Sequence, residues 1–417
     1  MKLIVKDFAK IKEANLKFDG LTVIAGDNNT GKSTVGKIMF TLFHRLRNMP
    51  QLVLDDRKQA VVTYLVNSQL GRNDGDGSLI PMIKKLLQIA DNLQVDEFVV
   101  DSWHRDIVKG IHDEFQQDLS EQEKKKLREK IVSVWNHSDA AIEQEIVKRA
   151  FTDVFAGQMN PFQNKVQTEI RLEVQQKEKI IKFSENNCVA CQSTINLLED
   201  AIYVDDPFIV EDCFRNTGRP AEGPRAALLK YLSADYRPSV VDMIEIREKL
   251  ADINCLLQQT IPGNIVHKEN RLVLALNNQS GELYVENWSA GIKAFAILKR
   301  LLENNSLKER GILILDEPEI HLHPQWQLIY AEIIVLLQKA FNLTVLITTH
   351  SPFFLDAIEV FTHKHHIENL TNYYLSEAAG DGIRFREVTE NIDQIYEKMS
   401  NPLQELENIR AKLQMER

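Results

Sequence analysis

Residues 26–33 read Gly26-Asp27-Asn28-Asn29-Thr30-Gly31-Lys32-Ser33 and fit the pattern G-x-x-x-x-G-K-[ST], which is typical of loops that bind nucleoside triphosphates. Residues 21–25 are apolar and β-branched and predict a buried strand, and residues 34–40 predict a helix. A strand, a glycine-rich turn and a helix N-terminus aim backbone N–H groups and a positive dipole at one point. A polyphosphate can bind there.

The side chains of this loop have distinct expected roles. Lys32 would reach the β and γ phosphates of ATP, and the Ser33 hydroxyl would help to hold Mg²⁺. Thr34 and the loop residues 26–31 would line the bound nucleotide. The alternative is a turn between a strand and a helix that binds nothing, and the later motifs of the chain argue against it.

The composition is that of a globular protein with one large or two modest domains. Of its 417 residues, 44% are hydrophobic and 26% are charged. The longest apolar runs, 311–315 and 343–347, are too short to span a bilayer, and the N-terminus lacks the apolar segment of a signal peptide. We therefore expect a cytoplasmic protein that has no membrane partner. Four cysteines in a chain of this length do not indicate a disulfide framework.

The net charge of −10, from 60 acidic and 50 basic residues, argues against a protein that coats nucleic acid over its whole surface. The densest basic run, 124–130, contains interleaved glutamate and lies in a helical segment. This pattern favours a solvated helix face over a nucleic-acid site. A local DNA-binding site stays open.

The hydrophobic pattern divides the chain into a discontinuous α/β domain and a helical insertion. Alternating apolar residues before the loop predict two further strands within 1–44. Residues 45–167 form the predicted insertion, in which a flexible loop is expected at 73–78. Its apolar residues have helical spacing in four segments, 79–93, 96–118, 121–135 and 139–156.

Strand signals return from residue 168, so 168–417 is assigned to the same domain as 1–44. From residue 288 the pattern alternates between helix and strand, as in a parallel sheet. The predicted strands are 168–184, 201–204, 264–276, 282–287, 312–315 and 344–347; helices are expected within 225–260, and a short strand and a polar helix within 382–415.

Two carboxylates follow the predicted strand 312–315. Nucleotide hydrolysis needs one carboxylate that organises Mg²⁺, a role expected for Asp316. It also needs a group that orients and deprotonates the attacking water, a role expected for Glu317. A strand that ends in an acidic turn is the alternative, and the upstream phosphate loop argues against it.

Two further segments carry candidate site residues. His350 follows the strand 344–347, where it could contact the γ-phosphate, although a lone histidine is more often structural. Ser289 and Gly291 precede a predicted helix within 294–302, where a serine is commonly an N-cap.

In this order, the four segments resemble the ATP-binding-cassette (ABC) type of ATPase head, and more narrowly the RecF/SMC/OLD group. Ser289 and Gly291 stand where that group has its signature motif, and His350 matches its switch histidine. The segment 316–324, Asp-Glu-Pro-Glu-Ile-His-Leu-His-Pro, is similar to the OLD-type Walker B motif and its following loop. The resemblance covers about 1–44 and 168–400. It implies an α/β ABC-type P-loop fold: a mixed sheet with flanking helices and an antiparallel β subdomain.

The resemblance also implies a mechanism. Two heads dimerise face to face, and each ATP lies between the phosphate loop of one copy and Ser289 and Gly291 of the other. Lys32, Glu317 and His350 would then be the catalytic residues, while Ser33 and Asp316 would hold the metal. Lys293 either adds charge to this clamp or is a surface lysine.

The chain departs from the family pattern in three places. Trp288 replaces leucine at the first signature position, and the Q-loop glutamine has no clear match, so by position the segment 203–207 stands in its place. The residues after His350 do not show the acidic pattern of a Toprim nuclease. We therefore expect a separate effector, such as a nuclease or toxin, as in standalone OLD-like ATPases of bacterial anti-phage defence or toxin-type systems.

Two other patterns invite a metal interpretation. Cys188-Val-Ala-Cys191 is similar to the zinc hook of double-strand-break-repair ATPases, but one C-x-x-C supplies only two of four zinc ligands, which favours buried thiols. Residues 363–366, His-Lys-His-His, could bind a metal, but a polar surface loop is favoured.

Three rival functions are considered. A RecF-like ATPase of DNA repair or recombination would bind DNA directly, with an affinity that depends strongly on salt. A scaffold would bind ATP without turnover, which the presence of Lys32, Asp316 and Glu317 argues against. A transporter ATPase is disfavoured because no membrane-domain coupling helix is evident.

Overall fold

The computed structural model describes residues 1–68, 79–95, 99–161, 166–214, 223–234, 250–276, 281–380 and 382–415. The predicted loop 73–78, part of the predicted helical region 225–260, and Asp381 lie outside the described residues. The chain forms two compact units, one of Met1–Arg47 with Ala150–Arg417 and one of Asn48–Arg149. Among the described residues, no helix combines the length and the apolar character needed to cross a bilayer.

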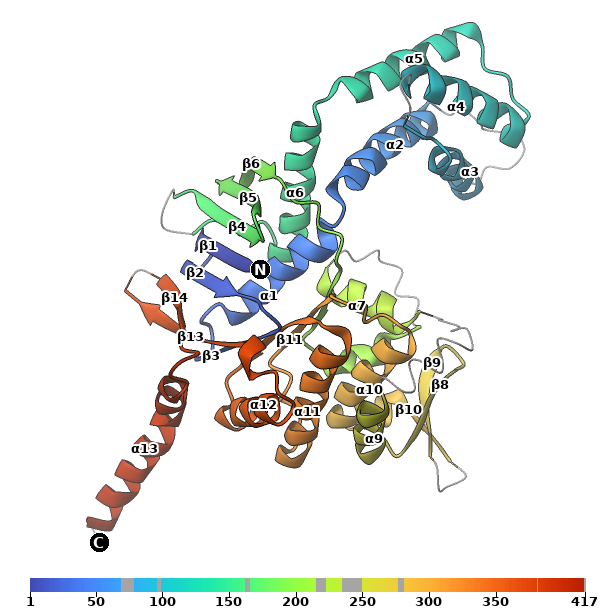
Figure 1. The fold of residues 1–417 in the computed structure, drawn as a ribbon. Helices are drawn as coiled ribbons and strands as arrows, with labels where there is room; N and C mark the ends of the chain where they lie inside the picture. The colour runs from blue at the N-terminus through green and yellow to red at the C-terminus, as the bar shows by residue number, and fades with distance from the viewer. Residues whose placement is uncertain are drawn as a thin grey trace. The chain divides into compact units, whose positions relative to one another are not determined.

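The first unit contains an eleven-stranded mixed sheet of order β6-β5-β4-β1-β2-β14-β13-β3-β12-β11-β7 (Figure 1). Its strands are β1 (Lys2–Phe8), β2 (Ile11–Lys17), β3 (Leu21–Gly26), β4 (Thr168–Val174), β5 (Lys177–Ser184), β6 (Asn187–Ser193), β7 (Ala201–Val204), β11 (Ile312–Asp316), β12 (Thr344–Thr349), β13 (Thr371–Ala379) and β14 (Gly382–Glu387).

Strands β13, β3, β12, β11 and β7 run parallel, and their register decides where the site lies. Ala25 pairs with Thr349, Asp316 pairs with Thr348, and Val204 pairs with Leu315. The carboxyl ends of β3, β12, β11 and β7 therefore meet at one edge of the sheet, which is where parallel α/β sheets bind ligands. These strands are apolar and buried on both faces, as parallel strands are.

Helices pack around the parallel part of the sheet and complete its core (Figure 1). Ser289 and Ser351 cap the N-termini of two of them, because their hydroxyls accept hydrogen bonds from Ile292 N and Phe354 N. The helices are α1 (Lys32–Phe40), α7 (Pro224–Leu232), α9 (Ala251–Thr260), α10 (Ala290–Glu303), α11 (Pro324–Phe341), α12 (Pro352–Lys364) and α13 (Asp393–Met415).

A separate three-stranded antiparallel sheet has the order β10-β9-β8. It comprises β8 (Gly263–Lys268), β9 (Arg271–Leu276) and β10 (Glu282–Tyr284). Together with the large mixed sheet and its helices, it gives the α/β fold that the sequence predicts, including an antiparallel β subdomain.

The second unit is helical. Trp103 is fully buried in its core, and Ser120 with Glu123 forms a capping box at the start of α5. Within the basic run, Lys124 pairs with Glu121 at 2.8 Å and Arg128 pairs with Asp101 at 2.9 Å. Its helices are α2 (Met49–Asn67), α3 (Leu79–Asp91), α4 (Val99–Phe115), α5 (Glu121–Asn136) and most of α6 (Asp139–Phe155).

The second unit ends at Arg149, inside α6, and not at 167 where the sequence pattern put the end of the insertion. The physical reason is aromatic packing by the last turns of α6. Phe151 and Phe155 lie 6.1 and 4.9 Å from Phe8 of β1, and Phe151 lies 5.0 Å from Phe183 of β5, between ring centroids. These contacts tie the end of α6 to the antiparallel part of the sheet.

A polar network ties the segment after α1 to the start of β7. Asp200 accepts hydrogen bonds from Tyr231 and Arg47, the latter at 2.9 Å, and contacts His44 Nδ1 at 2.8 Å. Burial by itself raises the pKa of Asp200, but the hydrogen bonds from His44 and Tyr231 and the charges of His44 and Arg47 outweigh it and lower the pKa.

Asp200→Asn is expected to lower the free energy of unfolding by about 1–3 kcal/mol at pH 7, because a buried charge-assisted network loses its acceptor. A lowered folded-state pKa stabilises the protein above the unfolded-state pKa of about 3.9 and loses that effect as the pH falls through the folded-state value. The difference between variant and parent should therefore shrink on acidification in urea titrations. Glu282→Gln, in an exposed ion pair with Lys268, is the control and should change stability little; an Asp200→Asn effect independent of pH would contradict the assignment.

Candidate active site

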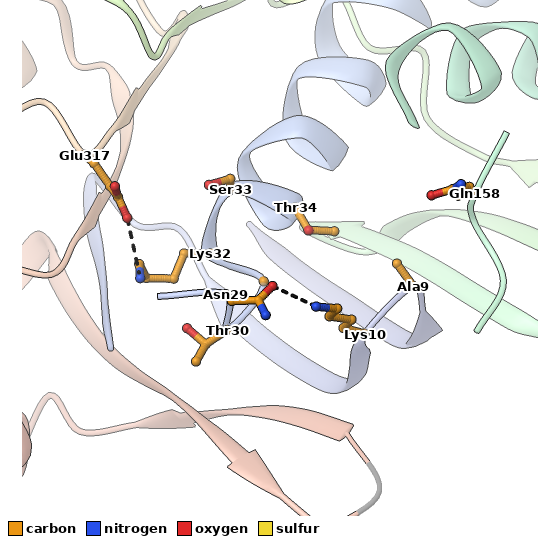
Figure 2. A pocket seen from close by; sticks show the side chains of 10 residues that line it. Ala9, Lys10, Asn29, Thr30, Lys32, Ser33, Thr34, Gln158 and Glu317 are labelled. Atoms are coloured by element: carbon orange, nitrogen blue, oxygen red, sulfur yellow. Dashed lines mark hydrogen bonds and ion pairs between the residues drawn. The ribbon is translucent and has the colours of Figure 1, made fainter. Parts of the chain in front are cut away.

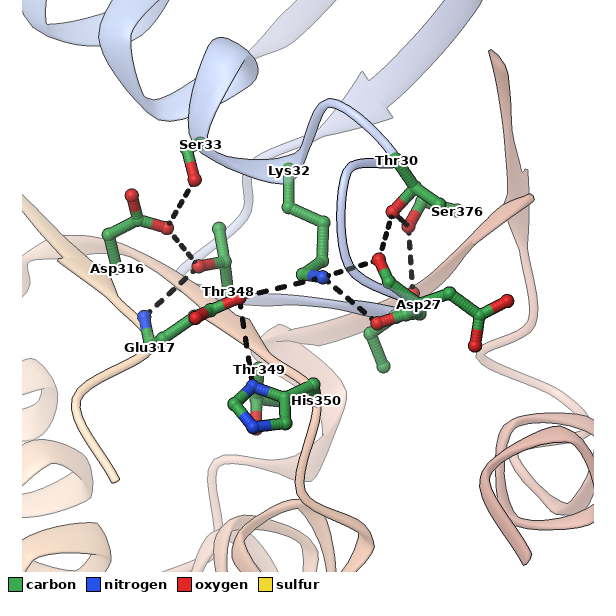
Figure 3. Close-up of polar contacts among 12 residues, drawn as sticks. Asp27, Thr30, Lys32, Ser33, Asp316, Glu317, Thr348, Thr349, His350 and Ser376 are labelled. Carbon is green, nitrogen blue, oxygen red and sulfur yellow. Dashed lines mark hydrogen bonds and ion pairs between the residues drawn. The ribbon is translucent and has the colours of Figure 1, made fainter. Parts of the chain in front are cut away.

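The phosphate loop connects β3 to α1 and requires glycine at both of its ends (Figure 3). Gly26 has φ +149° and Gly31 has φ +74°, backbone conformations that other residues rarely adopt. A Cβ atom on Gly26 would also lie 2.5 Å from the carbonyl oxygen of Ser376. The loop is therefore shaped by backbone geometry and by its close approach to β13.

Ser376 of β13 stabilises the phosphate loop through hydrogen bonds. Its buried hydroxyl lies 2.7 Å from the Thr30 hydroxyl and donates to Ala25 O at 3.2 Å. Thr30 in turn donates to Asp27 O at 2.7 Å. The exposed side chains of the loop are held at its rim, where Asn29 accepts from Lys10 Nζ at 2.7 Å. Asp27, Asn28 and Asn29 are exposed.

Lys32 lies inside the loop and is 3% exposed. Its Nζ donates to Gly26 O at 2.9 Å and to Asp27 O at 2.8 Å, and it lies 3.6 Å from Glu317 Oε1. Burial lowers the pKa of Lys32, and the carboxylates of Glu317 and Asp316 counteract this shift. An ammonium group held inside the loop is suited to bind an anion.

Asp316 stands at the end of β11, facing the first turn of α1. Its Oδ1 accepts from Ser33 Oγ at 3.1 Å and from the Thr348 hydroxyl, and its Oδ2 accepts from Tyr203 OH at 2.5 Å. Burial, together with the charge of Asp316, raises the pKa of Tyr203, so this phenol remains a hydrogen-bond donor. Asp316 and Ser33 thus present a carboxylate and a hydroxyl side by side, as divalent cations such as Mg²⁺ require.

Glu317 and His350 follow the neighbouring strands β11 and β12, and the Glu317 carboxylate contacts both His350 and Lys32 (Figure 3). Glu317 Oε1 lies 3.6 Å from His350 Nδ1. The backbone N–H of Glu317 donates to Thr348 O at 3.0 Å, and Glu317 has a positive φ of +50°. The site therefore combines a carboxylate, an imidazole and an ammonium group around one point.

The carboxyl group of Glu319 binds the backbone of His350. It is 2% exposed, and its Oε1 accepts from Thr349 Oγ1 at 2.6 Å and from His350 N at 3.2 Å. Burial raises the pKa of this carboxyl, while the same hydrogen bonds counteract the shift. A buried carboxyl thus anchors the backbone of His350.

The segment 203–207, which is expected in place of the Q-loop, spans the end of β7, the strand beside β11. Val204 pairs with Leu315, so Asp205 follows β7 beside Asp316. Burial raises the pKa of Asp205, and the charge of Asp316 raises it further. A second carboxyl therefore lies next to the predicted metal ligand.

Ser289 and Gly291 lie at the N-terminus of α10 and do not line the cavity beside the phosphate loop. Ser289 is exposed and acts as an N-cap, whereas Gly291 is covered by Trp326, whose ring would lie 2.5 Å from a Cβ at this position. The signature glycine thus has a packing role within this copy. Lys293 is neither surface nor clamp, because it is 2% exposed and pairs with Glu211 at 2.7 Å.

The cavity beside the phosphate loop has a volume of 310 Å³ and is large enough for a small ligand (Figure 2). Its lining comes from the β1–β2 turn, the phosphate loop, the start of α1, the turn after α6 and the end of β11. The residues are Ala9, Lys10, Asn29, Thr30, Gly31, Lys32, Ser33, Thr34, Gln158 and Glu317.

The two metal-like patterns lie away from this cavity. Cys188 and Cys191 lie in β6 and form no disulfide, and they are half-buried rather than buried as expected, because β6 is the edge strand of the sheet. His365 Nε2 lies 3.0 Å from Glu332, which also pairs with Lys364 at 2.6 Å. Among the residues that the structure describes, no three or more His, Cys, Asp or Glu side chains cluster as metal ligands would.

Sequence reasoning missed several residues that shape the site. Tyr203 and Thr348 bind Asp316, Glu319 anchors His350, and Ser376 braces the loop. Glu319 lies inside the quoted segment 316–324 and Tyr203 inside 203–207, while Thr348 directly follows the predicted strand 344–347, so their proximity was a usable signal. Ser376 lies in a strand that the sequence pattern did not predict, and nothing local indicates its role.

The chain is similar to the Retron Ec83 probable ATPase of Escherichia coli, with 36% identity over 100 residues, which are 24% of this chain and 18% of that protein. It is also similar to the Septu protein PtuA of Bacillus thuringiensis, with 28% identity over 106 residues, which are 22% of this chain and 26% of that protein. The match thus spans about a fifth to a quarter of the length of these relatives.

The SMC head domain from Thermotoga maritima is a structural neighbour with 10% sequence identity and a TM-score of 0.39, over 93% of this chain and 98% of that one. Residues 21–356, more than half of the chain, match the family model described as "AAA domain, putative AbiEii toxin, Type IV TA system". The chain therefore belongs to this AAA family of ATPase domains.

Proposed function

We propose that this chain binds ATP with Mg²⁺, hydrolyses it to ADP and phosphate, and uses the nucleotide to control a separate effector. The observation that carries the proposal is that Lys32, Asp316, Glu317 and His350 come together from the ends of two strands, β11 and β12, and from the N-terminus of α1. Each of these side chains matches a group that phosphoryl transfer to water requires.

The donor set fits Mg²⁺. Ser33 Oγ and Asp316 Oδ1 lie 3.1 Å apart, and Mg²⁺ is commonly held by one or two such oxygens together with phosphate oxygens and water. Ser33 and Asp316 would hold the ion, and Asp205 lies next to Asp316 at the end of the neighbouring strand. When bound, it would neutralise charge on the phosphate oxygens.

The chain's own residues would supply the remaining chemistry. Lys32 would exchange its bonds to the carbonyls of Gly26 and Asp27 for the β and γ phosphates. Glu317 would accept a proton from the attacking water, and His350, 3.6 Å from Glu317, would contact the γ-phosphate. Residues 26–34 would surround the phosphates with backbone N–H groups.

We further propose that a second copy completes the site. Ser289 is exposed at the N-terminus of a 14-residue helix and does not line the cavity of its own copy. A helix N-terminus that carries a solvent-exposed hydroxyl is suited to bind a phosphate on another copy. Gly291 is covered by Trp326 of its own copy, so Ser289 rather than Gly291 would make this contact.

The effector is proposed to be a separate protein, such as a nuclease or toxin, in a bacterial anti-phage defence or toxin-type system in the cytoplasm. The description of the family, which names a toxin and a type IV TA system, supports this setting, as do relatives named for a retron and for Septu. Direct DNA binding, as in a RecF-like ATPase, is the competing outcome and would appear as strong salt-dependent affinity of the isolated chain.

Light scattering on Glu317→Gln protein, with and without ATP and Mg²⁺, tests the two-copy mechanism. An ATP-dependent rise in mass to a dimer or larger species, abolished by Ser289→Arg but not by Gln192→Arg at an exposed position of β6, would support it. A mass that ATP does not change, whether monomer or dimer, would contradict ATP-dependent assembly of this chain alone.

A further inference from the structure

The cavity beside the phosphate loop extends from Glu317 at one end to Gln158 at the other. Figure 2 shows these two side chains far apart, with Thr34 and Lys10 between them. Glu317 and Lys32 mark the end where a γ-phosphate would bind, so the nucleobase of a bound nucleoside triphosphate would extend toward Gln158. Neither the phosphate loop nor any other motif of the chain assigns a role to Gln158.

The backbone that carries Gln158 is held on both sides. Gln158 N donates to Phe155 O at 3.0 Å, and the next residue, Met159, donates to Asn186 Oδ1 at 2.8 Å. Met159 is fully buried, and its carbonyl accepts from Ala9 N at 2.8 Å. Gln158 is therefore fixed beside the β1–β2 turn that lines the same cavity.

The side chain of Gln158, by contrast, is exposed at the cavity and forms no hydrogen bond within the described part of the chain. Lys10, its polar neighbour in the lining, is already bonded to Asn29 at 2.7 Å. Both the NH₂ group and the carbonyl oxygen of the Gln158 side chain can therefore bind a ligand without breaking an internal hydrogen bond. A site of this kind adds affinity without a cost in stability.

The chemistry of a carboxamide distinguishes the two purine bases. Its N–H donor and carbonyl acceptor lie side by side and match the N6 donor and N7 acceptor of adenine. Guanine presents two adjacent acceptors, O6 and N7, which would leave the carbonyl of Gln158 facing another acceptor. Lysine and arginine, which only donate, match guanine instead.

We propose that Gln158 recognises the nucleobase at this site and selects adenine over guanine. The inference rests on the proposed function, because it requires a nucleoside triphosphate bound at the phosphate loop. Gln158 acts as a specificity-determining residue at the base, while Lys32 and Ser33 bind the phosphates whatever the base.

Calorimetric titration of the full chain with ATP, GTP and tripolyphosphate, each with Mg²⁺, tests this assignment. Gln158→Ala should weaken ATP binding by roughly tenfold, as expected for the loss of one bidentate base contact, and leave GTP and tripolyphosphate binding unchanged. Gln158→Lys should shift the preference toward GTP. Gln192→Ala, at an exposed position of β6, is the matched control and should change none of the three affinities.

The outcomes separate the two proposals. An ATP-to-GTP affinity ratio that is the same in the parent and in Gln158→Ala would overturn the assignment of Gln158 and leave the proposed ATPase intact. The proposed function and the inference would both be overturned if the parent protein bound neither ATP nor tripolyphosphate. They would also be overturned if Lys32→Ala bound both ligands with the affinity of the parent. Because Gln158 is exposed, its variants are expected to fold, which their thermal unfolding would verify.

Discussion

Glu317→Gln is expected to lower the turnover of ATP by roughly 10²–10⁴-fold, the contribution typical of a general base, while ATP binding is retained. Glutamine has the same shape but cannot accept a proton. The hydrogen bond from the backbone N–H of residue 317 to Thr348 O, at 3.0 Å, does not depend on the side chain and should survive. Phosphate release under saturating ATP measures the turnover.

The effect of Glu317→Gln on turnover must be distinguished from its effect on the affinity for ATP. Lys32 lies 3.6 Å from Glu317, so removal of the carboxylate charge could also change nucleotide affinity. A direct titration with ATP and Mg²⁺ distinguishes the two effects. Glu309→Gln, at an exposed position before β11, is the matched control and should hydrolyse ATP at the parent rate. Parent-like turnover by Glu317→Gln would show that another group activates the water.

Gly26→Ala is expected to lower the free energy of unfolding by roughly 3–5 kcal/mol, which is a large share of the stability of a typical domain. Two costs combine. The φ of +149° is rarely adopted by residues with a Cβ, and that Cβ would lie 2.5 Å from the carbonyl oxygen of Ser376. Since β13 is a central strand of the sheet, its backbone cannot retreat without breaking pairing with β3.

Two other glycines make matched controls for this substitution. Gly380→Ala isolates the cost of a positive φ, because its φ is +54° and nothing lies within 4 Å of the added Cβ. It should cost about 1 kcal/mol. Gly281→Ala, with open space and no positive φ, should be close to neutral. Urea titrations of the three variants give the comparison, and a Gly26→Ala cost no larger than that of Gly380→Ala would show that the loop and β13 can separate.

The phosphate loop and the carboxylate strand could be predicted because each is a local signal. A buried strand, a glycine-rich turn and a helix start lie within 21–40, and the strand that ends in Asp316 and Glu317 lies within 311–317. Both patterns depend on periodicity and on residue types at fixed spacing, which a sequence displays directly. The strand pairing of β3, β12 and β11 then follows from the usual α/β order.

The strand that holds Ser376 and the loop that holds Gln158 could not be predicted in this way. β13 reads Thr-Asn-Tyr-Tyr-Leu-Ser-Glu-Ala-Ala and has no strict alternation, because its first six residues are buried on both faces. Gln158 lies in an irregular turn whose position depends on Asn186 and Ala9, both distant in sequence. Non-local contacts of this kind leave no period in the sequence.

The signature segment illustrates the same limit. Sequence reasoning placed Ser289 and Gly291 at a helix start, and the structure has that helix. It could not indicate that Trp326, 35 residues later, packs onto Gly291, or that Lys293 is buried against Glu211. The burial of a side chain depends on which helix covers it, and that is settled only when the layers pack.

The sequence by itself determined the α/β class and the positions of the phosphate loop, of Asp316 and Glu317 after their strand, and of His350 after the next one, because backbone geometry at these positions is encoded over a few residues. The tertiary structure alone decided that Ser376 braces the loop, that Asp205 stands beside Asp316, and that Gln158 closes the far end of the cavity. These residues meet because strands distant in the chain become neighbours in the sheet, and the register of that sheet is set by the burial of its faces as a whole.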